Sequence, residues 1–113
     1  DYFLSMDTPP TAVMCANDTM AISAIKEIFR RGFRVPDDTS IIGFDNITIA
    51  SQITPALSTV SVPVEEIAKQ SMSMLRAAMN DDETIYQHSV LPCELVLRDS
   101  STGCKKKQSA IGS

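Results

Sequence analysis

The feature that most constrains the fold is a pair of short apolar runs with an amphipathic segment between them, all within about 35 residues. The runs at 11–16 (TAVMCA) and 40–44 (SIIGF) are apolar on both faces, which is typical of strands buried on both sides. A strand, a helix and a strand over this length are typical of a right-handed parallel crossover. The sequence therefore predicts an α/β fold with a parallel sheet flanked by helices.

The segment between the two runs predicts the first helix. Its apolar residues recur at helical spacing, and its charged residues take the opposite side. Asn17 or Asp18 can cap the first turn of this helix, and Gly32 supplies the left-handed residue that ends it.

A second helix is predicted after Pro63, which suits the first turn of a helix. Its apolar face comprises Val64, Ile67, Ala68, Ser71, Met74, Leu75 and Ala78. A helix with such a face needs a partner surface. Short strands are also expected, at 57–60, 89–91 and 93–98.

The charge balance argues against direct binding to nucleic acid. The chain has 113 residues with 14 acidic and 10 basic side chains, and its net charge is -4. Three of the bases form one run at 105–107, so the rest of the chain is more acidic still. A body of this sign repels phosphate backbones. No apolar run has the roughly 20 residues that a membrane span needs, and no basic amphipathic helix suits a membrane surface.

The cysteine spacing and the composition also limit how the chain can be organised into domains. Cys15, Cys93 and Cys104 match neither a disulfide framework nor a zinc site, so we expect reduced thiols in a cytoplasmic protein. The length allows one compact domain at most. After residue 99 the composition turns polar, and we expect an ordered unit over 1–100 with a disordered tail over 101–113. Because the chain begins with Asp1, we expect a fragment of a longer protein.

Two polar pairs follow the predicted parallel strands at their carboxyl ends, where α/β sheets bind small ligands. Asn17 and Asp18 follow the first strand, and Asp45 and Asn46 follow the second. Both pairs reach one edge of the sheet if these strands are neighbours. A carboxylate accepts hydrogen bonds from vicinal hydroxyls or a ring N–H, and an amide both donates and accepts. Sugars and nucleobases present such groups.

Each of these four residues also has a structural explanation. Asp18 is better explained as a helix cap, and Asn46 as a turn residue. Asn17 suits a turn and a ligand contact equally. Asp45 has no helix pattern after it to cap, so a ligand contact is favoured over a hydrogen bond within the loop.

Catalytic and cofactor motifs are weak. His88 is the one histidine and lies among polar residues, with no Ser or Cys in a recognisable arrangement, so we interpret it as a surface residue. The four glycines are spread too widely for a phosphate-binding loop, and no cluster of metal ligands occurs. We expect no catalytic residue, no cofactor and no metal.

Three collinear segments resemble the C-terminal part of bacterial transcriptional regulators of the lactose-repressor (LacI/GalR) family. They are PTAVMCANDTMAISAIKEIFRRGFRVPDDTSIIGFDN, TPALSTVSVPVEEIA and LPCELVLRDS. The resemblance implies a type I periplasmic-binding-protein-like fold, with mainly the C-terminal subdomain present. It also implies that the helix-turn-helix DNA-binding domain and most of the N-terminal subdomain are absent from this chain.

The same resemblance implies site residues. Asn17 and Asp45 match positions that contact the effector in the cleft between the two subdomains. Ile22 and Ile53 match positions at the subunit interface, which makes them expected dimer contacts, with ordinary core packing as the alternative.

The family chain crosses between its subdomains near Val62 and Val64, two further cleft positions where some members carry a polar or aromatic side chain. In the family, the helix that follows packs on the N-terminal subdomain. Without that subdomain, we expect its apolar face to be exposed and to drive association of this chain.

These observations predict the effector-sensing and dimerising portion of a bacterial transcriptional repressor. It would bind a small molecule such as a sugar or a nucleobase-like metabolite, act as a homodimer, and reach DNA only through the absent helix-turn-helix domain. The alternative is the C-terminal lobe of a periplasmic sugar-binding transport protein. An enzyme that uses Asp45 or His88 in acid–base chemistry is a third hypothesis. A signal peptide upstream would indicate transport, and a helix-turn-helix would indicate regulation.

Overall fold

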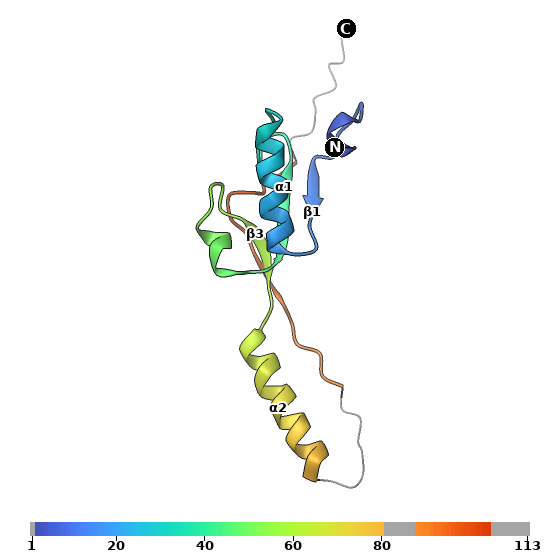
Figure 1. The fold of residues 1–113 in the computed structure, drawn as a ribbon, viewed down its shortest axis with the longest axis vertical. Coiled ribbons are helices and arrows are strands. Elements are labelled where there is room, and N and C mark those ends of the chain that lie inside the picture. The colour runs from blue at the N-terminus through green and yellow to red at the C-terminus, as the bar shows by residue number, and fades with distance from the viewer. Residues whose placement is uncertain (1, 81–87, 105–113) are drawn as a thin grey trace.

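A four-stranded sheet in the order β1-β2-β3-β4 forms the centre of the molecule (Figure 1). The computed structural model describes residues 2–80 and 88–104. The strands are β1 (Ala12–Met14), β2 (Ser40–Asp45), β3 (Ser58–Ser61) and β4 (Glu94–Val96). The first three run parallel, and β4 pairs antiparallel with β3. The predicted α/β fold class is therefore confirmed.

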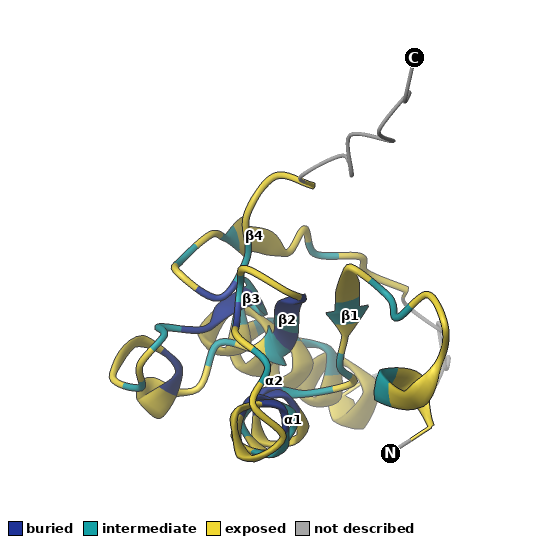
Figure 2. Cartoon of the chain, turned by 90° about the horizontal axis from the view of Figure 1, so that it is seen from above, coloured by how far each residue is buried: buried dark blue, intermediate teal, exposed yellow. Residues whose placement is uncertain are grey.

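Helix α1 (Asp18–Arg30) connects β1 to β2 and forms the predicted parallel crossover. Its buried apolar residues Ala21, Ile25 and Ile28 pack on the sheet, and the opposite side of the helix is exposed (Figure 2). Gly32 follows with a φ of 82°, a left-handed conformation that favours glycine and ends the helix as predicted.

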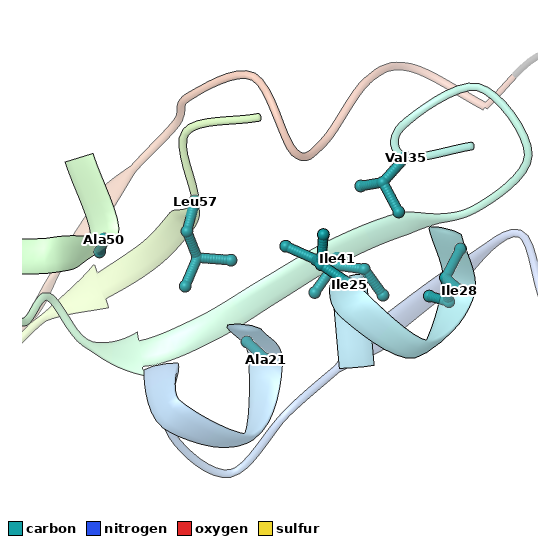
Figure 3. Packing of buried hydrophobic residues seen from close by; sticks show 7 residues of the cluster. All are labelled: Ala21, Ile25, Ile28, Val35, Ile41, Ala50 and Leu57. Carbon is teal, nitrogen blue, oxygen red and sulfur yellow. The ribbon is translucent and has the colours of Figure 1, made fainter. Parts of the chain in front are cut away.

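The hydrophobic core lies between α1 and the centre of the sheet (Figure 3). Ile41 of β2 and Leu57, which precedes β3, are fully buried there. The short 3-10 helix Thr48–Ser51 covers one end of the cluster with Ala50, and a second one, Phe3–Ser5, has no buried residue. The remaining members are Ala21, Ile25, Ile28 and Val35. Such burial contributes roughly 1.5–3 kcal/mol for each large aliphatic side chain.

Helix α2 (Val64–Asn80) begins directly after Pro63, as predicted, but it contains no buried residue. It extends away from the sheet along the long axis of the molecule (Figure 1). The Cα radius of gyration is 20.1 Å, whereas a compact domain of about 100 residues has a radius of about 13 Å. The predicted exposure of its apolar face is confirmed for Val64, Ile67 and Leu75.

The strand predicted at 89–91 is wrong, since the described part of the return from α2, residues 88–104, forms one strand, β4. Residues 88–92 lie beside α2, beyond the end of β3, so they have no neighbouring strand with which to pair (Figure 1). Pro92 also lacks the N–H that a ladder needs.

Residues 100–102 are held by hydrogen bonds at the start of β2 and β3, although 101 and 102 belong to the predicted tail. Ser100 is fully buried, and its hydroxyl donates to the Ile41 carbonyl oxygen (2.6 Å) and accepts from the Ser58 N–H (2.8 Å). Ser101 and Thr102 bond to Ser58 and Ser40. These small polar residues satisfy backbone groups at the start of β2 and β3, which composition alone does not reveal. The rest of the predicted tail, at 105–113, lies outside the described residues.

Candidate functional site

Asn17 and Asp45 lie at the same edge of the sheet. Strands β1 and β2 are parallel neighbours, and Met14 pairs with Ile42. Cys15 continues this pairing, since its N–H donates to the Ile42 carbonyl oxygen at 2.8 Å. Asn17 and Asp45 each lie three residues beyond their member of the Met14–Ile42 pair. The two residues predicted to contact a ligand are therefore at the carboxyl ends of adjacent strands, where α/β sheets bind ligands.

Asn17 is the N-cap of α1, so the prediction that Asp18 caps this helix is wrong. The Asn17 backbone is extended, and its Oδ1 accepts a hydrogen bond from the Met20 N–H at 2.8 Å. Asp18 already belongs to the first helical turn, which is why its own side chain is free for another task. The Nδ2 group of Asn17 makes no hydrogen bond with the described residues and can still donate.

Asp18 instead connects α1 to two other elements. Its side chain is fully buried, with Oδ1 accepting from the Thr59 hydroxyl (2.5 Å) and Oδ2 from the Ile47 N–H (2.8 Å). A Cβ on Gly43 would collide with Asp18 Oδ1, so β2 needs a glycine at this close approach. The positive end of α1 also favours a carboxylate here.

Asp45 ends β2 with an exposed side chain and a φ of 107°. Its carboxylate makes no hydrogen bond or ion pair with the residues that the structure describes. Asn46 follows with a φ of 55°, so the chain turns through two left-handed residues. This turn leaves the Asp45 carboxylate at the sheet edge, where it can accept hydrogen bonds from a bound molecule.

Asn46 is held by the protein at both ends of its amide. The Arg98 Nη2 donates to its Oδ1 at 2.8 Å, and its Nδ2 donates to the Ser61 hydroxyl at 3.2 Å. Its backbone N–H donates to the Thr59 hydroxyl at 3.3 Å. The interpretation of Asn46 as a turn residue is confirmed by these contacts and by its φ. Sequence reasoning missed Thr59, Ser61 and Arg98, because no local pattern links them to the turn.

Ile22 and Ile53 are half-buried and pack against the edge of the hydrophobic core. Ordinary core packing therefore accounts for the buried part of each side chain. Their proposed role as dimer contacts stays a prediction.

A separate groove of about 420 Å³ lies between α2 and the segment that returns from it. Apolar side chains such as Ile67, Met74 and Leu91 line it, together with His88 and Cys93. The Ser89 hydroxyl donates to Gln70 Oε1 at 2.6 Å and joins the two walls. His88 is exposed, as predicted for a surface residue, and lies beside this groove.

The family resemblance places two further residues, Val62 and Val64, in the cleft between the subdomains. Val62 is half-buried and Val64 is exposed.

Partial burial raises the pKa of the Cys15 thiol above its ordinary value. Among residues 2–80 and 88–104, no three His, Cys, Asp or Glu side chains come close enough together to hold a metal ion. No helix within the same residues has the length and apolar composition to cross a membrane.

The chain belongs to the periplasmic binding protein-like domain family, which it matches over residues 2–101. Its relatives include transcriptional repressors. The probable HTH-type transcriptional repressor ExuR of Bacillus subtilis (strain 168) is 46% identical over 100 residues, which make up 88% of this chain and 30% of ExuR. The repressor CytR of Escherichia coli (strain K12) is 39% identical over 98 residues, or 87% of this chain and 29% of CytR. The chain thus spans less than a third of either relative.

A solved structure supports the same relationship to transcriptional regulators. A LacI family transcriptional regulator from Enterococcus faecalis V583, crystallised with bound ribose, is 25% identical with a TM-score of 0.83. The likeness covers 92% of this chain and 38% of that protein. The resemblance to the C-terminal part of LacI/GalR regulators and the periplasmic-binding-protein-like fold are therefore confirmed. These relatives are repressors, not enzymes.

Proposed function

We propose that the chain is the C-terminal part of the effector-binding core of a LacI-type transcriptional repressor. In this proposal a small polar metabolite binds at the ligand edge, which we define as Asn17 and Asp45. The observation that carries it is the placement of two polar side chains at matching positions beyond a paired register on adjacent parallel strands. Kinship with ExuR and CytR supports the regulatory role.

The chemistry of the ligand edge favours a sugar or a nucleoside. A carboxylate such as that of Asp45 accepts hydrogen bonds from two vicinal hydroxyls, and the Asn17 Nδ2 donates to a ring or hydroxyl oxygen. The Enterococcus faecalis regulator was solved with ribose, a molecule that offers all of these groups.

Regulation would follow from the way the chain enters and leaves α2. Strand β3 runs toward α2 and β4 returns from it, so this pair would connect two lobes. A ligand that contacts both lobes favours one of their orientations, provided that its affinity differs between orientations. A helix-turn-helix domain elsewhere in a cytoplasmic homodimer would convert that preference into a change in DNA binding. Ile22 and Ile53 would contribute to the dimer contact.

Replacement of Asp45 tests the proposal in the complete regulator. A panel of pentoses, hexoses, disaccharides and nucleosides is screened by thermal shift, and the affinity of any hit is measured by calorimetry. Loss of hydrogen bonds to a charged group should weaken binding by at least ~10-fold in Asp45→Ala. DNA binding without effector should be unchanged, because the Asp45 side chain makes no hydrogen bond or ion pair with the described residues.

Asp99→Ala is the matched control, since it removes another exposed carboxylate. Asp99 follows β4 and its N–H bonds to Ala56, which precedes β3, so Asp99 lies at the opposite edge of the sheet. This variant should bind the hit as the wild type does. Equal affinity of Asp45→Ala and wild type would reject Asp45 as a ligand contact.

A further inference from the structure

The turn that ends β2 has a backbone conformation that its own residues disfavour. Asp45 and Asn46 have φ values of 107° and 55°, in a region that is sterically costly for residues with a Cβ. Two such residues in succession persist only where the surrounding structure holds them, and held conformations of this kind cluster at ligand-binding positions. The contacts of this turn therefore show which residues keep it in the left-handed conformation.

The first set of contacts holds the backbone of the turn. The N–H groups of Asn46 and Ile47 donate to the Thr59 hydroxyl (3.3 Å) and to Asp18 Oδ2 (2.8 Å). The Thr59 hydroxyl in turn donates to Asp18 Oδ1. Asp18 and Thr59 are fully buried, so these acceptors are shielded from competing water.

The second set holds the Asn46 side chain. Arg98 Nη2 donates to Asn46 Oδ1 at 2.8 Å, while Arg98 Nη1 donates to the Leu57 carbonyl oxygen, also at 2.8 Å. On the other side, Asn46 Nδ2 donates to the Ser61 hydroxyl. Ser61 is the residue of β3 that pairs in register with Asp45. The Asn46 amide thus spans from the residue paired with Asp45 to an arginine anchored on the backbone before β3.

We propose that Asn46 is a positioning residue, whose amide, held between Arg98 and Ser61, keeps the left-handed turn that presents Asp45 at the ligand edge. Because Oδ1 and Nδ2 of the amide each bond to another side chain of the protein, we assign to Asn46 an action through Asp45. This inference deepens the proposed function and rests on it for the identity of the ligand edge.

Two substitutions separate the side-chain contacts from the backbone preference. Asn46→Gly tolerates the positive φ and removes both side-chain hydrogen bonds. Asn46→Asp keeps them, since a carboxylate accepts from Arg98 and also from the Ser61 hydroxyl, which can rotate to donate. Ser100→Ala is the matched control, because it removes buried hydrogen bonds at the opposite ends of β2 and β3.

Hydrogen exchange on the 113-residue chain without ligand measures the turn directly. In Asn46→Gly, the Ile47 amide should exchange about 10-fold faster relative to the amides of β2. In Asn46→Asp that ratio should match wild type within about threefold. In Ser100→Ala the strand amides should exchange faster, with no selective change at Ile47. An unchanged Ile47 ratio in Asn46→Gly would overturn the positioning role.

Binding of the panel hit in the complete regulator supplies the second readout. Affinity should fall about 10-fold in Asn46→Gly and be restored to within about threefold in Asn46→Asp. Restoration supports positioning, since a direct amide contact with the ligand would be lost in both variants, and loss in both would overturn the proposal. If no panel compound binds wild type, the proposed function fails, and the exchange ratio alone supports or overturns the role of Asn46 in the turn.

Discussion

The two long helices have comparable amphipathic patterns, but only one of them buries its apolar side. Helix α1 buries Ala21, Ile25 and Ile28 against the sheet, whereas α2 buries no residue at all. The difference comes from topology. Helix α1 joins two strands that pair with each other, so the crossover returns it to the sheet. Helix α2 is inserted between β3 and β4, which run in opposite directions, and the chain is free to leave the sheet before it returns.

This comparison separates two kinds of information in an amphipathic sequence. The pattern determines that a helix forms and which side is apolar. The connections on either side determine which surface that side can reach. For α2, the described residues supply only the narrow wall of the groove that includes Leu91 and Cys93. Under the proposed function, a second lobe outside this chain would complete the packing of α2.

Truncating one leucine in each region should give the largest difference. Leu57 is 0% exposed in the core and Leu75 is 53% exposed on α2. Leu57→Ala should lower the free energy of unfolding by about 2–5 kcal/mol, because it removes buried methyl groups and leaves a cavity. Leu75→Ala should change it by less than about 0.5 kcal/mol.

Urea unfolding followed by circular dichroism, at a protein concentration low enough to avoid association, measures both values. A loss at Leu75 as large as that at Leu57 would show that α2 is packed in solution, and the contrast between the two regions would disappear.

Association of the chain through α2 tests the second half of the comparison. Val64, Ile67 and Leu75 belong to the predicted apolar face of α2 and are exposed, and exposed apolar surface of this kind drives self-association. At about 50 µM, sedimentation velocity should show dimers or larger species. The double variant Ile67→Glu/Leu75→Glu should shift the chain to monomer, since carboxylates are costly to bury in such a contact.

Lys26→Glu on the exposed side of α1 changes the net charge by the same amount and serves as the control. It should leave the association unchanged. A compact monomer for the wild-type chain at this concentration would contradict the prediction. Dissociation by Lys26→Glu would show that net charge, not the α2 face, controls association.

Local patterns were enough to predict most of the elements. The apolar runs and the helical spacing predicted β1, α1, β2, β3 and α2, although β1 is shorter than the predicted 11–16 and β3 is displaced by one residue at each end. Local patterns failed where the role of a residue depends on hydrogen bonds to residues that are distant in the sequence. Asp18 looks like a cap, but its carboxylate bonds to Thr59 and the Ile47 backbone, which only the folded register brings near. Ser100 lies next to the predicted tail and satisfies the backbone of β2 and β3, which local composition does not reveal.

The candidate site shows the same division. Asn17 and Asp45 were found because the carboxyl end of a parallel strand can be recognised from sequence. Arg98 and Ser61 could not be found in this way. Their role depends on β4 returning antiparallel to β3, and this pairing follows a helix that has no buried residue.

Thiol labelling compares the two regions with the smallest perturbation. Cys15 is half-buried beside the core, and burial raises its pKa, whereas Cys93 is exposed and lines the groove along α2. A raised pKa leaves less thiolate at about pH 8, and the thiolate is the reactive form, so Cys15 should react about 10-fold more slowly with a small disulfide reagent. Raising the pH should speed the reaction of Cys15, because more of its thiol ionises. A Cys104→Ser background removes the third thiol, and the rates in urea should become equal.

Equal rates in the folded chain would mean that the segment around Cys15 is as open as the α2 groove. In the complete regulator only Cys93 should become slower, because a surface that covers α2 would close its groove while leaving β1 as it is.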